Sequence, residues 1–554
     1  MNLPGVESGD IGPTMGVVAF EQGWCRFDHV TLPRIALLAR YGHVAESGEW
    51  VPPPPRFGKR SYATMLLIRA AMVAGSANGL GKAATIAVRY CAVRRQFRRA
   101  GSSAETQVLD YPQVAMRTLP WLATAYALKC TGAFMTGMYF EMERRVESTG
   151  DTDMEKEVHA VGSCLKCVCT TLVVDGVEEL RRVCGGHGYS MYSGMQEIYG
   201  NSMVNFTGEG ENYMIVQQAS KALLRVYMER RRRRRRGKGS GRGSGGGSDG
   251  DSGDGDSGGG SKGGGGGGSG NNGTFGSPNF SFVRSKEELE GEKMPTDADL
   301  DDLPTLVRAF EHRAARLLAD TADVADAAAS DTSGVAALEG PAQWEGIRAA
   351  WAFGEMLILR AFAENCRERT AETGEGDRGG NDTAWQATEA AKAFGLGGRV
   401  PDAALGMLST LARLFALNLI MKNLADYLLD GYMTPTQGRA IAARVKSLLL
   451  EVRPLAVPLV DAMSFTDSEL NSAIGRKDGA VYETLLDWAK RDPMNEGKVV
   501  KGFREHYGKV LAMGRQSLLE KTGNVLEDLP GVVQQQQQQR DIAPRPPRPN
   551  IAKL

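Results

Sequence analysis

Residues 66–91 read LLIRAAMVAGSANGLGKAATIAVRYC, and this stretch decides the fold class. Apolar and small side chains recur along it at alternating spacings of four and three residues, which places them on one face of a helix. They are Leu66, Ala70, Val73, Ala77, Leu80, Ala84, Ala87 and Cys91. Because many of them are small, we expect neighbouring helices to approach this one closely. The stretch therefore predicts a long, packed helix in a mainly α protein.

Helical periodicity continues after this stretch. It covers about 110–145, 155–183 and 210–228, and it resumes near Pro304 and continues to about Lys521. The two blocks are long enough for two helical bundles, each with its own core.

Residues 1 to about 55 differ from the helical remainder. Gly9–Pro13 is turn sequence, and Trp24–Val30 alternates well enough for a short strand or two. These strands are too few to close a sheet, and a lone hairpin is marginal in water. We expect this segment to be the remnant of a β-domain whose earlier strands are absent.

Two polar segments complete the chain. Arg230–Arg236 is a run of seven arginines, and a Gly/Ser/Asp tract with almost no apolar residue follows it. Such a stretch cannot bury enough apolar surface to offset the entropy of ordering it, so it predicts a disordered linker. The polar segment with Gln534–Gln539 and Pro544–Pro549 predicts a flexible tail.

The sequence thus predicts five parts: a β-domain remnant, a first helical domain, a linker, a second helical domain and a tail. Their predicted ranges are 1–55, 56–229, 230–283, 284–530 and 531–554.

Composition excludes several classes of protein. The net charge is zero, so the chain as a whole indicates neither nucleic-acid nor membrane binding. Eight cysteines without a regular framework, and no apolar segment after Met1, indicate a reducing, intracellular setting. Charges interrupt the apolar runs before the ~18–20 residues that a bilayer requires, so no membrane span is expected.

Three clusters in the first helical block could serve a flavin site. Arg94 and Phe97 lie at the end of the long helix, where the planar guanidinium suits a pyrophosphate. Gly185 and Gly186 let a backbone approach a ligand closely. Glu209, on a loop before a helix, could abstract a proton if a pocket of low polarity raised its pKa.

Each cluster also has an ordinary structural interpretation. Arg94 could be a solvated arginine at a helix end, and Gly185 and Gly186 could form a helix C-cap. Glu209 and Glu211 could be carboxylates of a helix first turn. The residues taken singly leave both interpretations open.

The order and context of these clusters resemble the peroxisomal acyl-CoA oxidases, within the wider acyl-CoA dehydrogenase superfamily. The resemblance covers nearly all of the chain except linker and tail. Its landmarks include Gly9–Pro13, His29–Arg34, Arg89–Arg94, Val108–Tyr111, Leu122–Ala127 and Cys184–Tyr189. Landmarks similar to the family's second helical domain, which plain dehydrogenases lack, are His312–Leu317 and Gly475–Glu483.

The resemblance implies a role for each cluster. Glu209 matches the catalytic base, which removes the α-proton of a fatty acyl-CoA while a β-hydride moves to FAD. Molecular oxygen then accepts the electrons, giving a trans-2-enoyl-CoA and hydrogen peroxide. Arg94 and Phe97 match the segment that reaches the FAD pyrophosphate, and Gly185 and Gly186 match the loop near its adenosine end. Because each FAD is held by two chains in this family, a homodimer is implied.

The sequence departs from the family pattern at three places. Gly208 stands where an aromatic residue usually precedes the base, which should loosen the base and one wall of the substrate pocket. Arg98 stands where dehydrogenases have glycine. The family's N-terminal helical domain and the front of its β-domain have no counterpart here, which we interpret as truncation. The acyl chain-length preference cannot be predicted from the residues present.

Other signals receive less weight. Cys164, Cys167 and Cys169 lie in an unbroken helical stretch without a second ligand group, so no metal is expected. His187 fits a packed loop histidine better than a proton shuttle. The arginine run lacks interleaved aromatics and is followed by aspartates, so no nucleic-acid binding is expected.

The last three residues, Ala552-Lys553-Leu554, are a close variant of the Ser-Lys-Leu peroxisomal address. They predict binding to a peroxisomal import receptor and localisation in the peroxisome, where peroxide is handled. Two alternatives to the oxidase remain open. One is a dehydrogenase that passes electrons to a protein acceptor, and the other is a non-catalytic protein that binds oxidase partners.

Overall fold

The structure is a computed structural model. It describes residues 3–54 (except 19, 21, 40 and 41), 63–240, 277–296, 299–328, 335–366, 402–497 and 502–522. The predicted tail and the C-terminal tripeptide lie outside these ranges. The chain divides into two compact units, Met1–Thr484 and Leu485–Leu554.

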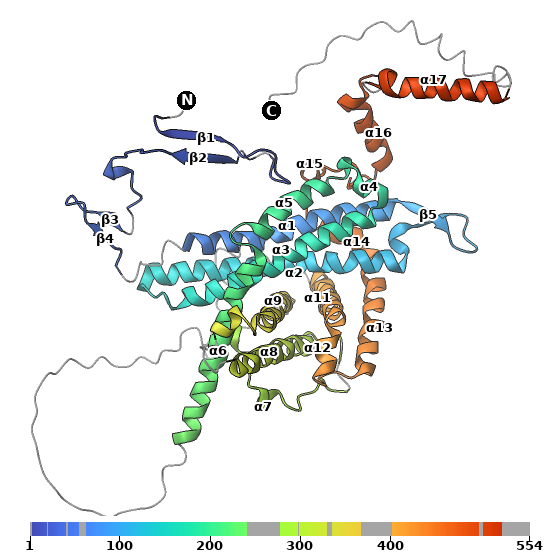
Figure 1. The fold of residues 1–554 in the computed structure, drawn as a ribbon. Helices are drawn as coiled ribbons and strands as arrows, with labels where there is room; N and C mark the ends of the chain where they lie inside the picture. The colour runs from blue at the N-terminus through green and yellow to red at the C-terminus, as the bar shows by residue number, and fades with distance from the viewer. Residues whose placement is uncertain are drawn as a thin grey trace, which may run out of the picture. The chain divides into compact units, whose positions relative to one another are not determined.

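Three long helices form the first bundle: α1 (Ala63–Val93), α2 (Pro112–Thr149) and α3 (Asp153–Val183). They lie side by side, each packed against the other two (Figure 1). Seven of the eight residues of the predicted stripe on α1 are buried, Ala77 being half-buried. A Cβ at Gly132 on α2 would lie 2.7 Å from the Cα of Ala74 on α1, so small residues set the close approach.

Helices on one side of this bundle carry the loop with Glu209. They are α4 (Gly185–Tyr189), α5 (Met195–Thr207) and α6 (Asn212–Ser240). Both α5 and α6 pack on α3, so the loop between them is held against that helix.

A second group of helices packs on the first bundle. It comprises α7 (Lys286–Leu289), α8 (Leu303–Ala327), α9 (Gln343–Asn365), α11 (Asp402–Lys422), α12 (Leu424–Leu429), α13 (Pro435–Val452), α14 (Ala456–Asp461) and α15 (Asp467–Leu470). α9 contacts α2, α3 and α6 (Figure 1). A Cβ at Gly354 on α9 would lie 2.6 Å from Val168 on α3. Because the two groups share a core, the predicted boundary at residue 284 does not separate compact units.

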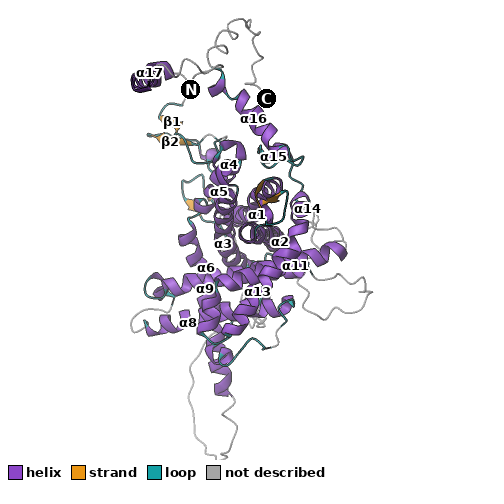
Figure 2. Ribbon diagram, turned by 90° about the vertical axis from the view of Figure 1, so that its right-hand side faces the viewer, coloured by secondary structure: helices purple, strands orange, loops and turns teal. Residues whose placement is uncertain are grey.

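The described strands are short and form three two-stranded antiparallel sheets (Figure 2). The pairs are β1 (Val6–Asp10) with β2 (Gly23–Phe27), β3 (His43–Val44) with β4 (Trp50–Val51), and β5 (Arg95–Arg98) with β6 (Glu105–Gln107). The predicted mainly α class with a small N-terminal strand remnant is confirmed. Gly9 and Asp10, predicted as turn sequence, end strand β1 instead.

The second compact unit is described only in part. Helix α16 (Val481–Arg491) leads into it, and α17 (Phe503–Thr522) follows after a short 3₁₀ turn at Pro493–Asn495. Within it the rings of Phe503 and Tyr507 stack at 6.1 Å between centroids.

The prediction of a disordered linker over residues 230–283 is wrong at both ends of that range. Helix α6 continues through the arginine run to Ser240, because several arginines find partners there. Arg230 donates to the carbonyl of Val283 at 2.7 Å, and Arg231 forms an ion pair with Asp326. At the other end, Phe280, Phe282 and Val283 are buried. The remainder of the predicted linker, 241–276, lies outside the described residues.

Two described helices are apolar and long enough to cross a bilayer, contrary to the expectation that charges interrupt every such run. They are α3 and the Ala404–Lys422 part of α11. The apolar window is 83% buried inside the protein for α3 and 56% for Ala404–Lys422, as in core helices of a bundle.

Candidate functional site

The loop that carries Glu209 is a sharp turn between two helices. α5 ends at Thr207 and α6 begins at Asn212. Glu209 adopts a left-handed conformation with φ of 56°, which costs on the order of 1–3 kcal/mol for a residue with a side chain. Gly210 follows with φ of 98°, and a Cβ there would lie 2.4 Å from the Ile215 side chain. The turn therefore depends on outside contacts to hold its shape.

The two carboxylates of the loop have different environments. Glu211 accepts hydrogen bonds from the backbone N–H groups of Tyr213 at 2.9 Å and Met214 at 3.2 Å, so it caps α6. The Glu209 carboxylate makes no hydrogen bond or ion pair with any described residue. The helix-cap interpretation therefore holds for Glu211, while Glu209 remains available to a ligand.

A buried lysine on α3, Lys166, forms hydrogen bonds with this loop. The Nζ of Lys166 on α3 donates to the carbonyls of Phe206 at 3.2 Å and Gly210 at 2.7 Å, and to Asn212 Oδ1 at 2.8 Å. Its side chain is completely buried, and burial lowers its pKa. Asn212 in turn donates to Thr170 Oγ1 at 2.9 Å. One ammonium thus ties both ends of the turn to α3.

A second buried cation lies beside the loop. Arg69 on α1 is 3% exposed, donates to Ser163 Oγ at 3.0 Å, and lies 3.4 Å from the carbonyl oxygen of Glu209. Burial lowers its pKa, and its Nε has no hydrogen-bond partner among the described residues.

Arg94 lies where α1 gives way to strand β5. Its Nη1 donates to the hydroxyl of Tyr482 at 2.7 Å, and this hydrogen bond raises the pKa of Arg94. Within the described residues the guanidinium has no carboxylate partner, so its charge is available to an anion. Phe97, on strand β5, is 71% exposed and has a φ of 55°, at an irregularity in the β5–β6 pairing.

Gly185 and Gly186 follow the end of α3. Gly185 has a φ of 62°, as expected of a glycine that ends a helix. A Cβ at either position would have no atom within 4 Å, so this backbone is open to a ligand. The neighbouring His187 ring lies edge-on to Tyr90 at 5.8 Å and to Tyr482 at 6.1 Å, which fits a packed histidine.

The structure brings two of the three predicted clusters together. Arg94 and the Gly185–His187 turn meet at Tyr482, at the C-terminal end of α1. Glu209 lies near Arg69, towards the other end of that helix. Arg69 and Val93 are separated by 93 − 69 = 24 residues of helix, or about 36 Å. Glu209 and Arg94 of one chain therefore do not meet.

Three residues of this arrangement were not predicted as site residues: Lys166, Arg69 and Tyr482. Lys166 and Arg69 are charged residues within apolar helical stretches, and that break in the pattern is the signal that could have revealed them. Tyr482 was recognised only as part of a landmark.

The cysteines of α3 act as small buried donors. Cys164 donates to the carbonyl of Ala350 at 3.1 Å, and Cys167 donates to the carbonyl of Asn212 at 3.3 Å. Burial raises the pKa of Cys167 to about 12 and that of Cys164 well above its ordinary value. In the described part of the chain, no group of three or more His, Cys, Asp or Glu residues could hold a metal ion.

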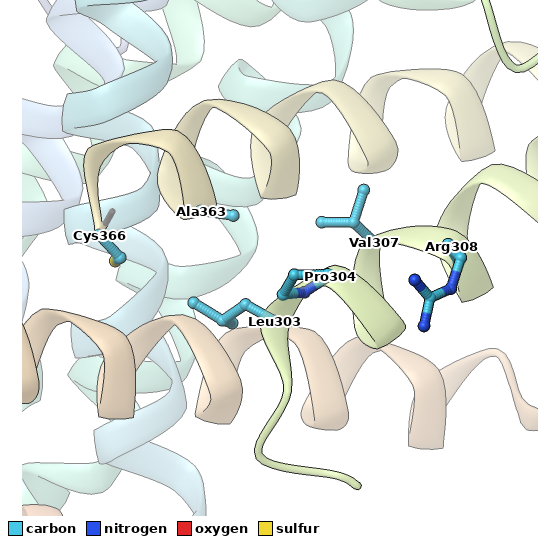
Figure 3. A pocket seen from close by; sticks show the side chains of 6 residues that line it. All are labelled: Leu303, Pro304, Val307, Arg308, Ala363 and Cys366. Atoms are coloured by element: carbon cyan, nitrogen blue, oxygen red, sulfur yellow. The ribbon is translucent and has the colours of Figure 1, made fainter. Parts of the chain in front are cut away.

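A small cavity lies apart from these residues. It has a volume of about 270 Å³ and is bordered by α8 and α9, with Leu303, Pro304 and Val307 facing Ala363 and Cys366 (Figure 3). Its lining is almost wholly apolar, with Arg308 as its charged member, and it contains none of the predicted site residues.

Comparison with known proteins agrees with this arrangement. The family model "Acyl-CoA oxidase, C-alpha1 domain" matches residues 62–224, and the model "Acyl-CoA oxidase" matches residues 385–512. The peroxisomal acyl-coenzyme A oxidase 1 of Rattus norvegicus is 30% identical over 512 residues, which cover 91% of this chain and 66% of that protein. The chain thus spans about two thirds of the length of this curated relative.

Solved structures give the same result. Arabidopsis thaliana acyl-CoA oxidase 1 is 29% identical, with a TM-score of 0.72, over 92% of this chain and 67% of that one. Acyl-CoA oxidase-1 of Caenorhabditis elegans, solved with FAD and ATP, is 27% identical with a TM-score of 0.72, over 92% and 65% of the two chains. Fold and site together define a helical bundle of the acyl-CoA dehydrogenase superfamily. Within that superfamily, the chain belongs to the acyl-CoA oxidase family, which confirms the resemblance inferred from its sequence.

Proposed function

We propose that this chain carries the catalytic base and part of the FAD-binding surface of an acyl-CoA oxidase. The reaction converts a fatty acyl-CoA and molecular oxygen into a trans-2-enoyl-CoA and hydrogen peroxide, the first step of peroxisomal fatty-acid β-oxidation. The observation that carries the proposal is the Glu209 carboxylate, which no described residue engages, on a turn held by two buried cations.

In this proposal Glu209 removes the α-proton of the acyl thioester. When bound, FAD would supply the acceptor for the β-hydride and the route of its two electrons to oxygen. The substrate therefore loses one proton and one hydride, and oxygen takes up both hydrogens as peroxide. Arg69 and Lys166 contact backbone carbonyls of the turn and leave the Glu209 carboxylate free.

The residues at the other end of α1 fit a cofactor that carries a pyrophosphate. Arg94 offers a charged, planar donor whose present partner is a neutral hydroxyl. Gly185 and Gly186 offer an open backbone, and Phe97 an exposed ring. These four residues would hold FAD near its pyrophosphate and adenosine.

The separation of the two ends supports a homodimer. About 36 Å of helix lies between Arg69, which contacts the Glu209 turn, and Val93, which precedes Arg94. This distance is greater than the length of an extended dinucleotide. Glu209 and Arg94 of one chain would therefore serve different cofactors, each cofactor being shared by two chains.

Localisation in the peroxisome is part of the same proposal. The relative from Rattus norvegicus is named a peroxisomal enzyme. The sequence ends in Ala552-Lys553-Leu554, which fits the peroxisomal import receptor and lies outside the described residues.

Incubation of the purified chain with FAD and a series of saturated acyl-CoAs under air tests the proposed activity. The proposal expects bound flavin and one peroxide for each enoyl-CoA formed. Turnover that requires an artificial electron acceptor and yields no peroxide would indicate a dehydrogenase. A chain that binds neither FAD nor acyl-CoA would indicate a non-catalytic interaction protein.

A further inference from the structure

Lys166 stands out among the buried groups that take no direct part in the proposed proton and hydride transfers. Its side chain is completely buried on α3, where an unpaired ammonium would be strongly unfavourable. All three of its described hydrogen bonds go to the segment Phe206–Asn212, 40 to 46 residues further along the chain. None goes to a carboxylate, so the described partners of Lys166 are all neutral oxygens.

The acceptors lie on both sides of Glu209. Phe206 is three residues before it, and Gly210 directly follows it. A single Nζ that holds both carbonyls fixes the distance across the turn, and with it the left-handed conformation of Glu209. Asn212 extends the same anchor to Thr170, one helical turn along α3.

The residue before the base adds to the need for such an anchor. At Gly208 there is no side chain to pack the turn against its surroundings, and a Cβ there would lie 2.8 Å from the carbonyl oxygen of Val204. Contacts below the turn therefore determine where the Glu209 carboxylate lies.

We propose that Lys166 is a positioning residue for the base: its Nζ holds the Glu209 turn in its reactive shape through hydrogen bonds to both sides of the turn. Lys166 touches neither substrate nor cofactor in this role. The inference rests on the proposed function, because it assigns to Lys166 a part in proton abstraction by Glu209.

The first experiment measures the turn itself, without substrate. Hydrogen–deuterium exchange of peptides covering residues 205–214 is compared in the full chain and in Lys166→Met. Loss of the anchor is expected to speed exchange in these peptides by at least 10-fold, while peptides from the middle of α2 are unchanged. Equal exchange in the two proteins would overturn the proposal.

The second experiment measures the base. In Lys166→Met, anaerobic flavin reduction by acyl-CoA is expected to slow by 10-fold or more near neutral pH, with little change in the half-saturating acyl-CoA concentration. The reason is that a carboxylate released from its place is poorly aligned with the α-proton, whereas Lys166 does not contact the acyl-CoA. An unchanged rate of flavin reduction, or a lower rate with an equal rise in the half-saturating acyl-CoA concentration, would overturn the proposal.

Arg313→Met provides a matched control. Arg313 is also a buried cation, on α8, and it bonds Asp426 and Asn423 rather than the turn. This variant should lose stability but keep the exchange rates of 205–214 and the rate of flavin reduction. If Lys166→Met does not fold, Lys166→Gln, which keeps one donor, replaces it in both experiments with the same criteria.

The two hypotheses fail in different ways. If the unmodified chain shows no flavin reduction by acyl-CoA, the proposed function fails, and the exchange experiment still decides whether Lys166 anchors the turn. If the unmodified chain is active but Lys166→Met retains the exchange rates and the rate of flavin reduction, only the inference about Lys166 fails.

Discussion

Arg94 and Tyr482, 388 positions apart in the sequence, are joined by a hydrogen bond of 2.7 Å from the guanidinium Nη1 to the phenol oxygen. The guanidinium also lies over the tyrosine ring, with its central carbon 5.9 Å from the ring centroid. The bond connects the end of the first long helix to the first turn of α16. It holds the arginine that we propose for the FAD pyrophosphate in a fixed place.

Tyr482→Phe is expected to weaken FAD binding about 10-fold, because the guanidinium then has to be ordered when the cofactor binds. Titration of the apoprotein with FAD, followed by flavin fluorescence, measures the dissociation constant. Tyr507→Phe, a hydroxyl removal within the second compact unit, serves as the control. An unchanged dissociation constant in Tyr482→Phe would contradict an orienting role for this hydroxyl.

The reactivity of the eight cysteines follows from their burial. Cys25 is exposed, whereas the other seven are buried, and burial raises the pKa of Cys130 and Cys167 to about 12. A thiol-alkylating reagent at mildly alkaline pH should modify Cys25 rapidly and the others only after denaturation. Peptide mapping after timed alkylation tests this, and rapid labelling of Cys164 or Cys167 in the folded chain would contradict their placement.

In the second helical group, the contact between Glu292 and His312 should make a pH-dependent contribution to stability. The two ring nitrogens of His312 each lie 2.8 Å from a carboxylate oxygen, one of Glu292 and one of Asp430. Burial tends to raise the pKa of Glu292, but hydrogen bonds from His312 and Arg284 outweigh it, and the pKa lies below the usual 4.5. The stabilisation by ionised Glu292 is therefore complete above pH 4.5 and is lost as the pH falls through its lowered pKa.

Glu292→Gln should accordingly reduce the free energy of unfolding by about 2 kcal/mol at neutral pH and by less in acid. Denaturant unfolding of both proteins between neutral and acidic pH measures this difference. A difference in the free energy of unfolding that stays constant, or that grows as the pH falls, would contradict the stabilisation by ionised Glu292.

The C-terminal tripeptide Ala552-Lys553-Leu554 predicts where the protein accumulates in cells. A fluorescent protein fused in front of the full chain should accumulate in peroxisomes, and deletion of Leu554 should leave it diffuse, since the receptor reads the last three residues. Replacement of Arg548 by alanine, outside the tripeptide, is the control. Peroxisomal accumulation without Leu554 would mean that another segment, or a partner chain, directs import.

The long helices could be predicted because their apolar periodicity is strong. The segments predicted at 110–145 and 155–183 correspond to α2 (Pro112–Thr149) and α3 (Asp153–Val183). The end of α6 was missed because seven consecutive arginines have no apolar pattern. Their helix depends instead on long-range partners such as Asp326 and the Val283 carbonyl, which composition does not reveal.

The candidate site could be predicted only in part. Glu209 and Arg94 lie in short motifs that can be recognised in the sequence. Lys166 lies among apolar residues, and only the fold brings it into contact with the Glu209 turn. The separation of Glu209 from Arg94 likewise depends on the straight course of α1. The sequence therefore indicates the candidate reactive groups, and the structure shows which residues contact them.

The central claim is that Glu209 is the base that removes the α-proton. Stopped-flow bleaching of the flavin by acyl-CoA, without oxygen, tests it in the unmodified chain and in Glu209→Gln, with Glu211→Gln as the matched control. We predict that Glu209→Gln binds FAD normally, but that acyl-CoA reduces this flavin about 10²–10⁴-fold more slowly, the range expected for loss of a general base. Glu211→Gln should remain active. Flavin bleaching in Glu209→Gln at the rate of the unmodified chain would contradict the account.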